Sequence, residues 1–128
     1  MNEAEQDAGL AATPNYRYAD HVGNQLFVAG QVPLDSTGTL VGENDPGRQA
    51  TVCLDNLSTL INVRGFDIED VHRLTVYVVG EHQKLLDTWD AVTAWFDNEV
   101  PPATLLGVNL LGYSGQLVEI DATVIRNG

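Results

Sequence analysis

The side chains best suited to acid–base chemistry are two carboxylates, Glu119 and Asp121, at alternate positions of a strand-like run near the end of the chain. An ordinary strand carries apolar or hydroxyl side chains at such positions. A carboxyl group in a partly apolar cleft has a raised pKa, and base catalysis near neutral pH requires one. Glu119 is therefore the candidate general base. The alternative is a structural carboxylate paired with Arg73 or with a backbone amide, and the sequence leaves both open.

The other reactive side chains carry weaker signals. His21, His72 and His82 lie far apart without a partner at metal-ligand spacing, so no metal site is predicted. Cys53 falls inside an apolar helical stripe and is predicted to be an inert core thiol. Tyr113 lies in a Gly-rich turn, which we expect at the tip of a hairpin, where it could close over a ligand. There is no Gly-rich phosphate loop, so no cofactor is expected.

The elements that must position these residues follow from the hydrophobic pattern. Residues 16–22 and 25–29 alternate around Gly23-Asn24 and predict a hairpin. Residues 46–64 and about 83–98 each carry one apolar stripe and predict two helices. The other predicted strands are a brief edge strand at 39–41, a strongly β-prone strand at 71–79, and two closing strands at 103–110 and 117–125. The order β-β-(β)-α-β-α-β-β predicts an α+β fold, a mixed six-stranded sheet with two helices on one face.

The face of this sheet that the helices leave free has a mixed character. Alternation along the last strand places Glu119 and Asp121 there, joined by Arg73, Thr75 and Tyr77 of the middle strand. Such a face is too apolar for water and too polar for an ordinary core. We therefore expect it to face other subunits, with the site between them.

Length and charge limit the remaining possibilities. The 128 residues fit one domain, predicted at residues 16–128 after a flexible arm at residues 1–15. Eighteen acidic residues against six basic ones give a net charge of −12, which repels nucleic acid and anionic lipid. The chain has one cysteine, no charged-then-apolar leader and no apolar run of the roughly 20 residues that a bilayer crossing needs. These features predict a cytoplasmic protein with neither membrane nor nucleic acid as partner.

Several motifs also run in order through almost the whole chain: Val22-Gly23-Asn24, Phe27 to Pro33, Asn56-Leu57, Thr75-Val76-Tyr77, Pro102-Ala103 and Leu117 to Ile120. Together with Tyr16 and Gln49, this series resembles the RidA/YjgF family of reactive-intermediate (enamine/imine) deaminases, formerly described as L-PSP endoribonucleases. The resemblance implies a chorismate-mutase-like fold. It also implies a cofactor-free homotrimer that binds small molecules in three clefts between neighbouring subunits.

The resemblance assigns roles to individual positions. Glu119 matches the family's acidic residue, which positions or activates water for attack on the imine carbon, and Tyr16 matches a cleft-lining tyrosine. Gly30 begins the family's Gly-Gln signature, with Ala29 where a serine is common. Tyr18 stands where a glutamine is usual. All five are therefore candidate site residues.

Two positions depart from the deaminase pattern in a way that bears on specificity. In the deaminases an arginine after Pro-Ala binds the substrate carboxylate, whereas Thr104 follows Pro-Ala in this chain. A hydroxyl does not replace a charge-assisted contact of about 1.5–3 kcal/mol. Trp89 stands where the family often has Asn, which makes the cleft wall more aromatic. Arg17 and Arg73 are the arginines near enough to substitute as an anchor, and the sequence does not decide between them.

Three functions follow as hypotheses. The first is a RidA-like hydrolytic deaminase that acts on a neutral or differently shaped imine, enamine or amide, with Glu119 as the base and Thr104 on the electrophile side. The alternative is a non-catalytic trimer that binds a small metabolite between the aromatic walls Tyr16, Tyr18 and Trp89. A ribonuclease is disfavoured, because the chain is strongly acidic and has no basic groove with interleaved aromatic residues.

Overall fold

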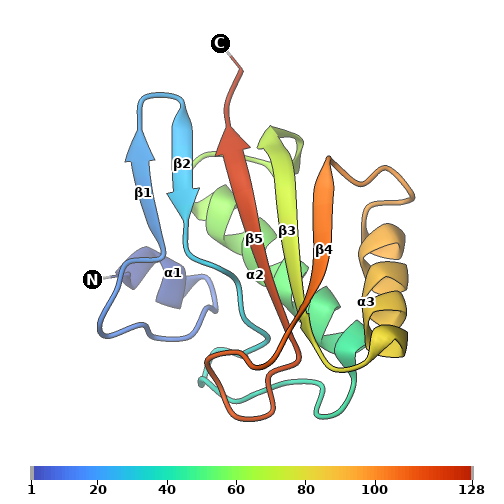
Figure 1. Cartoon of the computed structure of the whole chain (residues 1–128). Helices are drawn as coiled ribbons and strands as arrows, with labels where there is room; N and C mark the ends of the chain where they lie inside the picture. Colours follow the sequence, from blue (N-terminus) through green and yellow to red (C-terminus); the bar gives the residue numbers. More distant parts are fainter. Residues whose placement is uncertain (1, 128) are drawn as a thin grey trace.

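The structure, a computed structural model, describes residues 2–127. A mixed sheet of five strands is covered on one face by the two long helices (Figure 1). In chain order the elements are α1 (Glu3–Asp7), β1 (Ala19–Val22), β2 (Gln25–Val28), α2 (Pro46–Val63), the 3₁₀ turn η1 (Ile68–Asp70), β3 (Val71–Val79), α3 (His82–Trp95), β4 (Ala103–Val108) and β5 (Val118–Ile125). The predicted α+β class is confirmed.

The last strand of the chain is the middle strand of the sheet, whose order is β1-β2-β5-β3-β4. β5 pairs antiparallel with both β2 and β3. β3 and β4 are parallel, and α3 forms the crossover that a parallel pair requires. At the opposite edge, β1 and β2 form the predicted hairpin, with Gly23 at a φ of 61° in its two-residue turn.

Helix α2 begins where its capping residues predict. The side chain of Asp45 accepts a hydrogen bond from the N–H of Arg48, and Pro46 occupies the first turn, where its missing N–H costs nothing. The apolar stripe of the helix is buried along its whole length: Ala50, Cys53, Leu54, Leu57, Leu60 and Ile61. Most of this stripe packs against the sheet and forms the main core.

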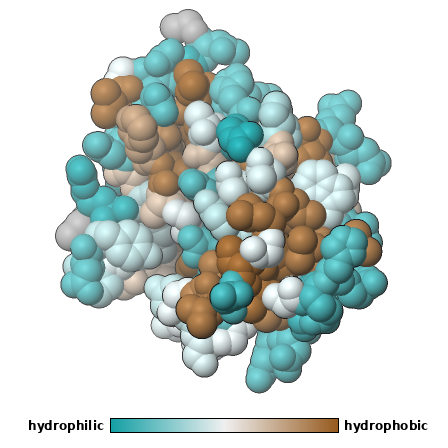
Figure 2. All heavy atoms as spheres, viewed as in Figure 1, coloured by the Kyte–Doolittle hydropathy of each residue, from teal (hydrophilic) through white to brown (hydrophobic). Residues whose placement is uncertain are grey.

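The two faces of the sheet differ as the alternation predicts. On β5, Val118, Ile120 and Val124 are buried on the helix side. Glu119 and Asp121 lie on the other face, which α2 and α3 leave uncovered, and we call it the open face. Figure 2 shows this side of the molecule, with a hydrophobic area over the lower halves of β5, β3 and β4 among polar side chains.

The predicted edge strand at residues 39–41 is wrong. The structure has one isolated bridge there, between Leu34 and Leu40. Pro33 lacks an N–H, and the carboxylate of Asp35 accepts hydrogen bonds from the N–H groups that follow it and closes a tight turn. The segment therefore adds no strand, and the sheet among residues 2–127 has five strands rather than six.

Residues 2–13, expected to form a flexible arm, pack against the domain. The Glu5 side chain in α1 is fully buried, and its Oε2 lies 2.5 Å from Nη2 of Arg64 at the end of α2. Leu10 is buried beside Tyr18. A five-residue helix is too short to show the periodicity that would have predicted it.

Helix α3 ends at Trp95, three residues earlier than predicted. Asp97 and Asn98 have φ values of 53° and 65°, a left-handed conformation that ends a helix. The predicted stripe of the helix, which includes Trp89 and Val92, faces the core. Neither this helix nor any other within residues 2–127 combines the length and hydropathy needed to cross a membrane.

Candidate functional site

Glu119 lies on the open face of the middle strand, beside Tyr77 of β3. Its carboxylate lies directly over Gly30, in the segment that follows β2. A Cβ atom at Gly30 would come closer to Oε2 of Glu119 than real Cβ contacts allow. Only a residue without a side chain therefore leaves room for the carboxylate in this position. The structure thus brings together two of the predicted site residues.

A buried glutamine, Gln116, holds the other oxygen of the same carboxylate. Its Nε2 donates to Oε1 of Glu119 at 3.2 Å and to the carbonyl oxygen of Val118 at 3.0 Å. Its Oε1 accepts a hydrogen bond from the N–H of Tyr113 at 3.2 Å. No motif singles out Gln116, but it shares the alternation of the buried positions Val118 and Ile120. A polar residue at a buried position is the signal that could have found it.

The loop before β5 is fixed from the helix side by Gln49 of α2, which is fully buried. Its Oε1 accepts hydrogen bonds from the N–H groups of Leu117 at 2.7 Å and Val118 at 3.2 Å. Its Nε2 donates to the carbonyl oxygens of Gly42 and Gly115, both at 3.1 Å. The entry to β5 is therefore set by a satisfied polar network, which orients the residues that follow it.

Tyr16 lies near the carboxylate of Glu119, and Tyr113 interacts with Tyr16 and with Gln116. The two tyrosine side chains remain partly open, at 42% and 43% exposure. The pKa of Tyr16 is raised to about 12, first by burial, then by the charge and side-chain hydrogen bond of Tyr113, and then by Glu119. Tyr16 therefore lies within interaction range of both Tyr113 and Glu119, and its hydroxyl is a neutral donor at physiological pH.

Tyr18 has a different environment from the one expected. It is buried, and its hydroxyl donates to the carbonyl oxygen of Ala11 at 2.8 Å. Its N–H donates to the side chain of Asn2 at 3.2 Å. Burial, followed by Tyr16, Tyr113 and Glu5, raises the pKa of Tyr18 to about 12. Tyr18 therefore packs the N-terminal segment against the domain, and its role as a cleft wall stays a prediction.

Ala29 belongs to the same region as Gly30. Its N–H donates to the carbonyl oxygen of Tyr18 at 2.8 Å, and its carbonyl oxygen accepts from Nε2 of Gln31 at 2.7 Å. Gln31 in turn bridges to Ile120 of β5. A shallow hollow of about 320 Å³ adjoins Ala29 and the exposed Phe27. The backbone around Gly30 is thus held firmly beside the strand that carries the candidate base.

Within a single subunit, Thr104 and Trp89 lie apart from Glu119. Thr104 is on the edge strand β4, aligned with Thr75 of β3, and its hydroxyl accepts a hydrogen bond from Nη2 of Arg73 at 2.8 Å. Trp89 packs against the core from α3, on the helix side of the sheet. The predicted site residues therefore do not form one group: most surround the middle strand, Thr104 lies at the β4 edge, and Trp89 lies on the opposite face of the sheet.

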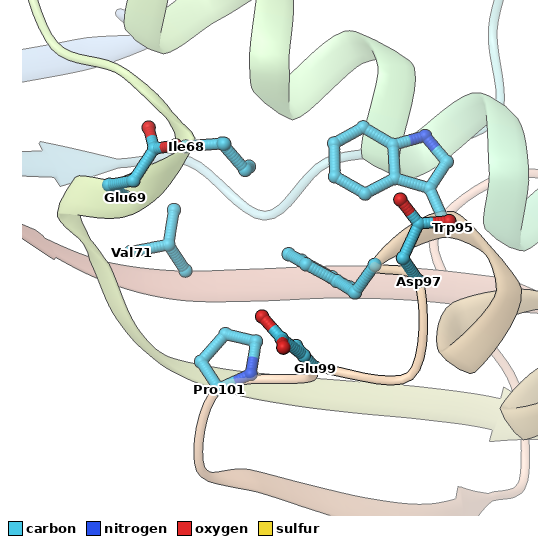
Figure 3. A pocket seen from close by; sticks show the side chains of 8 residues that line it. Ile68, Glu69, Val71, Trp95, Asp97, Glu99 and Pro101 are labelled. Atoms are coloured by element: carbon cyan, nitrogen blue, oxygen red, sulfur yellow. The ribbon is translucent and has the colours of Figure 1, made fainter.

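A larger hollow, of about 390 Å³, lies between η1 and the end of α3 (Figure 3). Its lining residues are Ile68, Glu69, Val71, Trp95, Phe96, Asp97, Glu99 and Pro101. None of the predicted site residues lines it, and the indole N–H of Trp95 is already bonded to Asp55 at 2.9 Å. We place the candidate site at Glu119 instead, because buried contacts fix its polar groups there.

Metal ligation and thiol chemistry have no structural support in the described part of the chain. No three His, Cys, Asp or Glu side chains of residues 2–127 gather closely enough to hold a metal ion. The thiol of Cys53 donates to the carbonyl oxygen of Val118 at 3.7 Å. Burial first, and then the charge of Glu119, raise the pKa of this thiol well above its ordinary value. Cys53 is therefore a core residue, as its place in the stripe predicts.

Comparison with known proteins agrees with the fold. The family model described as Endoribonuclease L-PSP matches residues 6–126. This chain belongs to the RidA/YjgF (L-PSP) family. A RutC family protein of Pyrococcus horikoshii is 30% identical over 114 residues, which cover 87% of this chain and 86% of that protein. A Salmonella typhimurium protein named 2-iminobutanoate/2-iminopropanoate deaminase is 25% identical over 125 residues, 96% of this chain and 95% of that one.

Solved structures share the architecture of this RidA/YjgF family member. A protein of Thermotoga maritima superposes with a TM-score of 0.83 at 28% identity, over 95% of this chain and 94% of that chain. The YjgF gene product of E. coli superposes with a TM-score of 0.80 at 25% identity, over 91% and 92% of the two chains. These similarities confirm the predicted family and the α+β fold.

Proposed function

We propose that this RidA/YjgF family member is a cofactor-free hydrolytic deaminase of small imines or enamines, with Glu119 as its general base. The observation that carries the proposal is the Glu119 carboxylate, which is fixed between Gly30 and Gln116 on the open face. The Salmonella relative, named as an imine deaminase and similar over nearly its whole length, supports the choice of reaction.

Imine hydrolysis needs only a base, water and proton donors. In our proposal Glu119 removes a proton from water while the oxygen bonds to the imine carbon, and the nitrogen takes up a proton, giving a carbinolamine. Glu119 then returns its proton to the amine nitrogen, and the carbon–nitrogen bond breaks. The hydroxyl proton leaves as the carbonyl forms and replaces the one taken up in the first step. The products are a carbonyl compound and ammonia.

The neighbours of Glu119 suit a mechanism in which Glu119 is the base and other groups donate protons. The Nε2 of Gln116 donates to one carboxylate oxygen and leaves the other free to accept a proton from water. The pKa of Tyr16, at about 12, keeps its hydroxyl protonated, so it acts as a donor to the ligand rather than as a second base. Tyr113, in the loop before β5, donates its N–H to Gln116 and so helps to orient the amide that holds Glu119.

We also propose that the protein works as a homotrimer with its clefts between subunits. Two observations support this. The open face carries apolar and polar side chains that no helix of the same chain covers. In addition, Thr104 lies on the β4 edge, apart from Glu119 on the middle strand. A second copy that brings its β4 edge to Glu119 would complete a cleft and exclude water from it.

An imine-hydrolysis assay tests the reaction. An amino-acid oxidase generates 2-imino acids in solution, and semicarbazide traps the part that is not hydrolysed. The wild-type protein should lower the yield of trapped product, and Glu119→Gln should reduce this hydrolysis by about 100-fold or more. Asp121→Asn, on the same strand and face, is the matched control and should keep the wild-type rate.

A wild-type protein that hydrolyses none of a series of 2-imino acids and neutral imines would reject the proposed reaction. The alternative, a trimer that binds a small metabolite without chemistry, would then be tested by thermal-shift titration with the corresponding 2-oxo acids and amides. Equal activity of the wild type and Glu119→Gln would reject Glu119 as the base while leaving the reaction itself in place.

A further inference from the structure

Arg73 has an unusual position for a cation in so acidic a protein. It extends from β3 toward the edge strand, where its Nη2 donates to Oγ1 of Thr104 at 2.8 Å. No carboxylate of residues 2–127 lies within ion-pair distance of its guanidinium, although the chain has 18 acidic residues. Its charge is therefore oriented by a hydroxyl but not neutralised.

Three of the other four arginines of the chain have partners, and the fourth, Arg48, is exposed on α2, the helix that covers the other face of the sheet. Arg17 lies 3.6 Å from a carboxylate oxygen of Asp20, Arg64 lies 2.5 Å from Glu5, and Arg126 stacks 4.2 Å above the ring of Phe66. Among residues 2–127, the one side-chain hydrogen bond of Arg73 is with a neutral group. A hydroxyl fixes the direction of a guanidinium and leaves its remaining N–H donors available.

The strand registers place Arg73 on the same face of the sheet as the candidate base. Tyr77 lies beside Glu119, and Thr75 and Arg73 follow on the same face of β3 toward its start. Thr104 is aligned with Thr75 on β4. Arg73 therefore lies with Thr104 at the β4 edge, which the proposed trimer would bring to the Glu119 of a neighbouring copy.

We propose that Arg73, oriented by Thr104, is the anion anchor of this cleft and that the ligand therefore carries a carboxylate. This inference rests on the proposed function, because the cleft needs a second copy of the chain. A planar guanidinium can bind both oxygens of a carboxylate with the donors that Thr104 does not use. Thr104 is then a positioning residue, not itself a ligand contact.

The proposal reverses the expectation drawn from Thr104 alone. A threonine after Pro-Ala predicts a cleft without a charged contact and hence a neutral ligand. In the structure the same threonine holds a guanidinium that comes from the adjacent strand. Assembly over the open face would also remove this charge from water, which is unfavourable unless an anion accompanies it. A ligand carboxylate supplies that anion.

A pair of ligands that differ in charge but little in shape tests the anchor. The probes are 2-oxobutanoate and its amide, 2-oxobutanamide, and titration calorimetry measures their affinities for the full-length protein. The wild type should bind the carboxylate about 10- to 100-fold more tightly than the amide. Arg73→Gln should abolish this preference, Arg73→Lys should keep part of it, and Thr104→Val should weaken it. Arg48→Gln, an exposed arginine of α2, should leave it unchanged.

Three results would overturn the proposal. The wild type could show no preference for the carboxylate, or Arg73→Gln could retain the preference. In a third case, Arg73→Gln could dissociate the assembly in size-exclusion chromatography with the preference intact, which would assign Arg73 to an ion pair between subunits. The test does not depend on turnover. A preference that Arg73→Gln removes, in a protein that hydrolyses no imine, would reject the deaminase and keep the anchor.

Discussion

The carboxylate of Glu119 lies against the α-carbon of Gly30 so closely that a side chain at that position would displace it. On its other side the same carboxylate accepts a hydrogen bond from Gln116. The candidate base is therefore held between a glycine, where a side chain would displace it, and a buried amide. Both contacts come from segments outside the strand that carries Glu119, so the fold rather than the local sequence fixes the geometry.

Gly30→Ala should displace the carboxylate without unfolding the protein, because the nearest atoms belong to the end of a flexible side chain. We expect the free energy of unfolding to change by less than about 1 kcal/mol and imine hydrolysis to fall by about 10-fold or more. Denaturant titration and the trapping assay measure the two quantities. Gly47→Ala in α2, where a Cβ has ordinary contacts, should keep full activity. Unchanged hydrolysis by Gly30→Ala would show that the contact is irrelevant to function.

Glu5→Ala should destabilise the protein by about 1–3 kcal/mol, because it leaves Arg64 unpaired and opens a space beneath α1. The lower part of the range applies if water reaches Arg64, whose side chain is 38% exposed. Glu5→Gln keeps the volume and an acceptor, so it should cost less. Urea denaturation measures both, with the exposed Asp7→Ala as control. If Glu5→Ala and Asp7→Ala are equally stable, α1 contributes nothing to the fold.

Tyr16 and Tyr18 should ionise at higher pH than ordinary tyrosines, since their pKa values are raised from 10.0 to about 12, mainly by burial. The unfolded chain loses these protons first, near pH 10. The stability linked to them is therefore complete below pH 10 and is lost as the pH rises through about 12. Ultraviolet titration of phenolate should show late ionisation, near pH 12, of Tyr16 and Tyr18. In Tyr16→Phe one late step should disappear, and its persistence would contradict the assignment.

Cys53 should resist thiol reagents in the native protein, because the side chain is fully buried and burial raises its pKa well above the ordinary value. The rate of labelling by a chromogenic disulfide should follow global unfolding and rise with denaturant. Rapid labelling of the native protein would show that the core opens locally beneath β5.

Regular burial made much of the fold predictable. Helix α2 and strand β3 each bury one periodic face, and β3 spans residues 71–79 as predicted. The prediction of a strand at residues 39–41 is wrong because a strand also needs partners. The turn at Asp35 leaves this segment only one bridge. The packing of residues 2–13 could not be predicted, because it depends on the distant Arg64 rather than on any local pattern.

The candidate site could be predicted only in part. Glu119, Gly30 and Tyr16 carry signals of type and spacing within their own segments, and the structure brings them together. The contact between Arg73 and Thr104 depends on the register of two strands that are 31 residues apart. Register and side-chain direction across a sheet are not contained in either strand alone. For this reason Thr104 alone indicated a neutral ligand, and the sequence did not decide between Arg17 and Arg73, whereas the structure places Arg73 beside Thr104.

The most direct test of the account is imine hydrolysis by mixed trimers. Glu119→Gln subunits lack the base, and Thr104→Trp subunits obstruct the opposite side of the cleft, so each homotrimer alone should be inactive. If each cleft takes its two sides from neighbouring subunits, random assembly of equal amounts leaves about one cleft in four intact. We therefore predict that co-refolded mixtures recover about a quarter of the wild-type rate. Mixed trimers that are verified by mass spectrometry and yet remain inactive would contradict a site between subunits with Glu119 as its base.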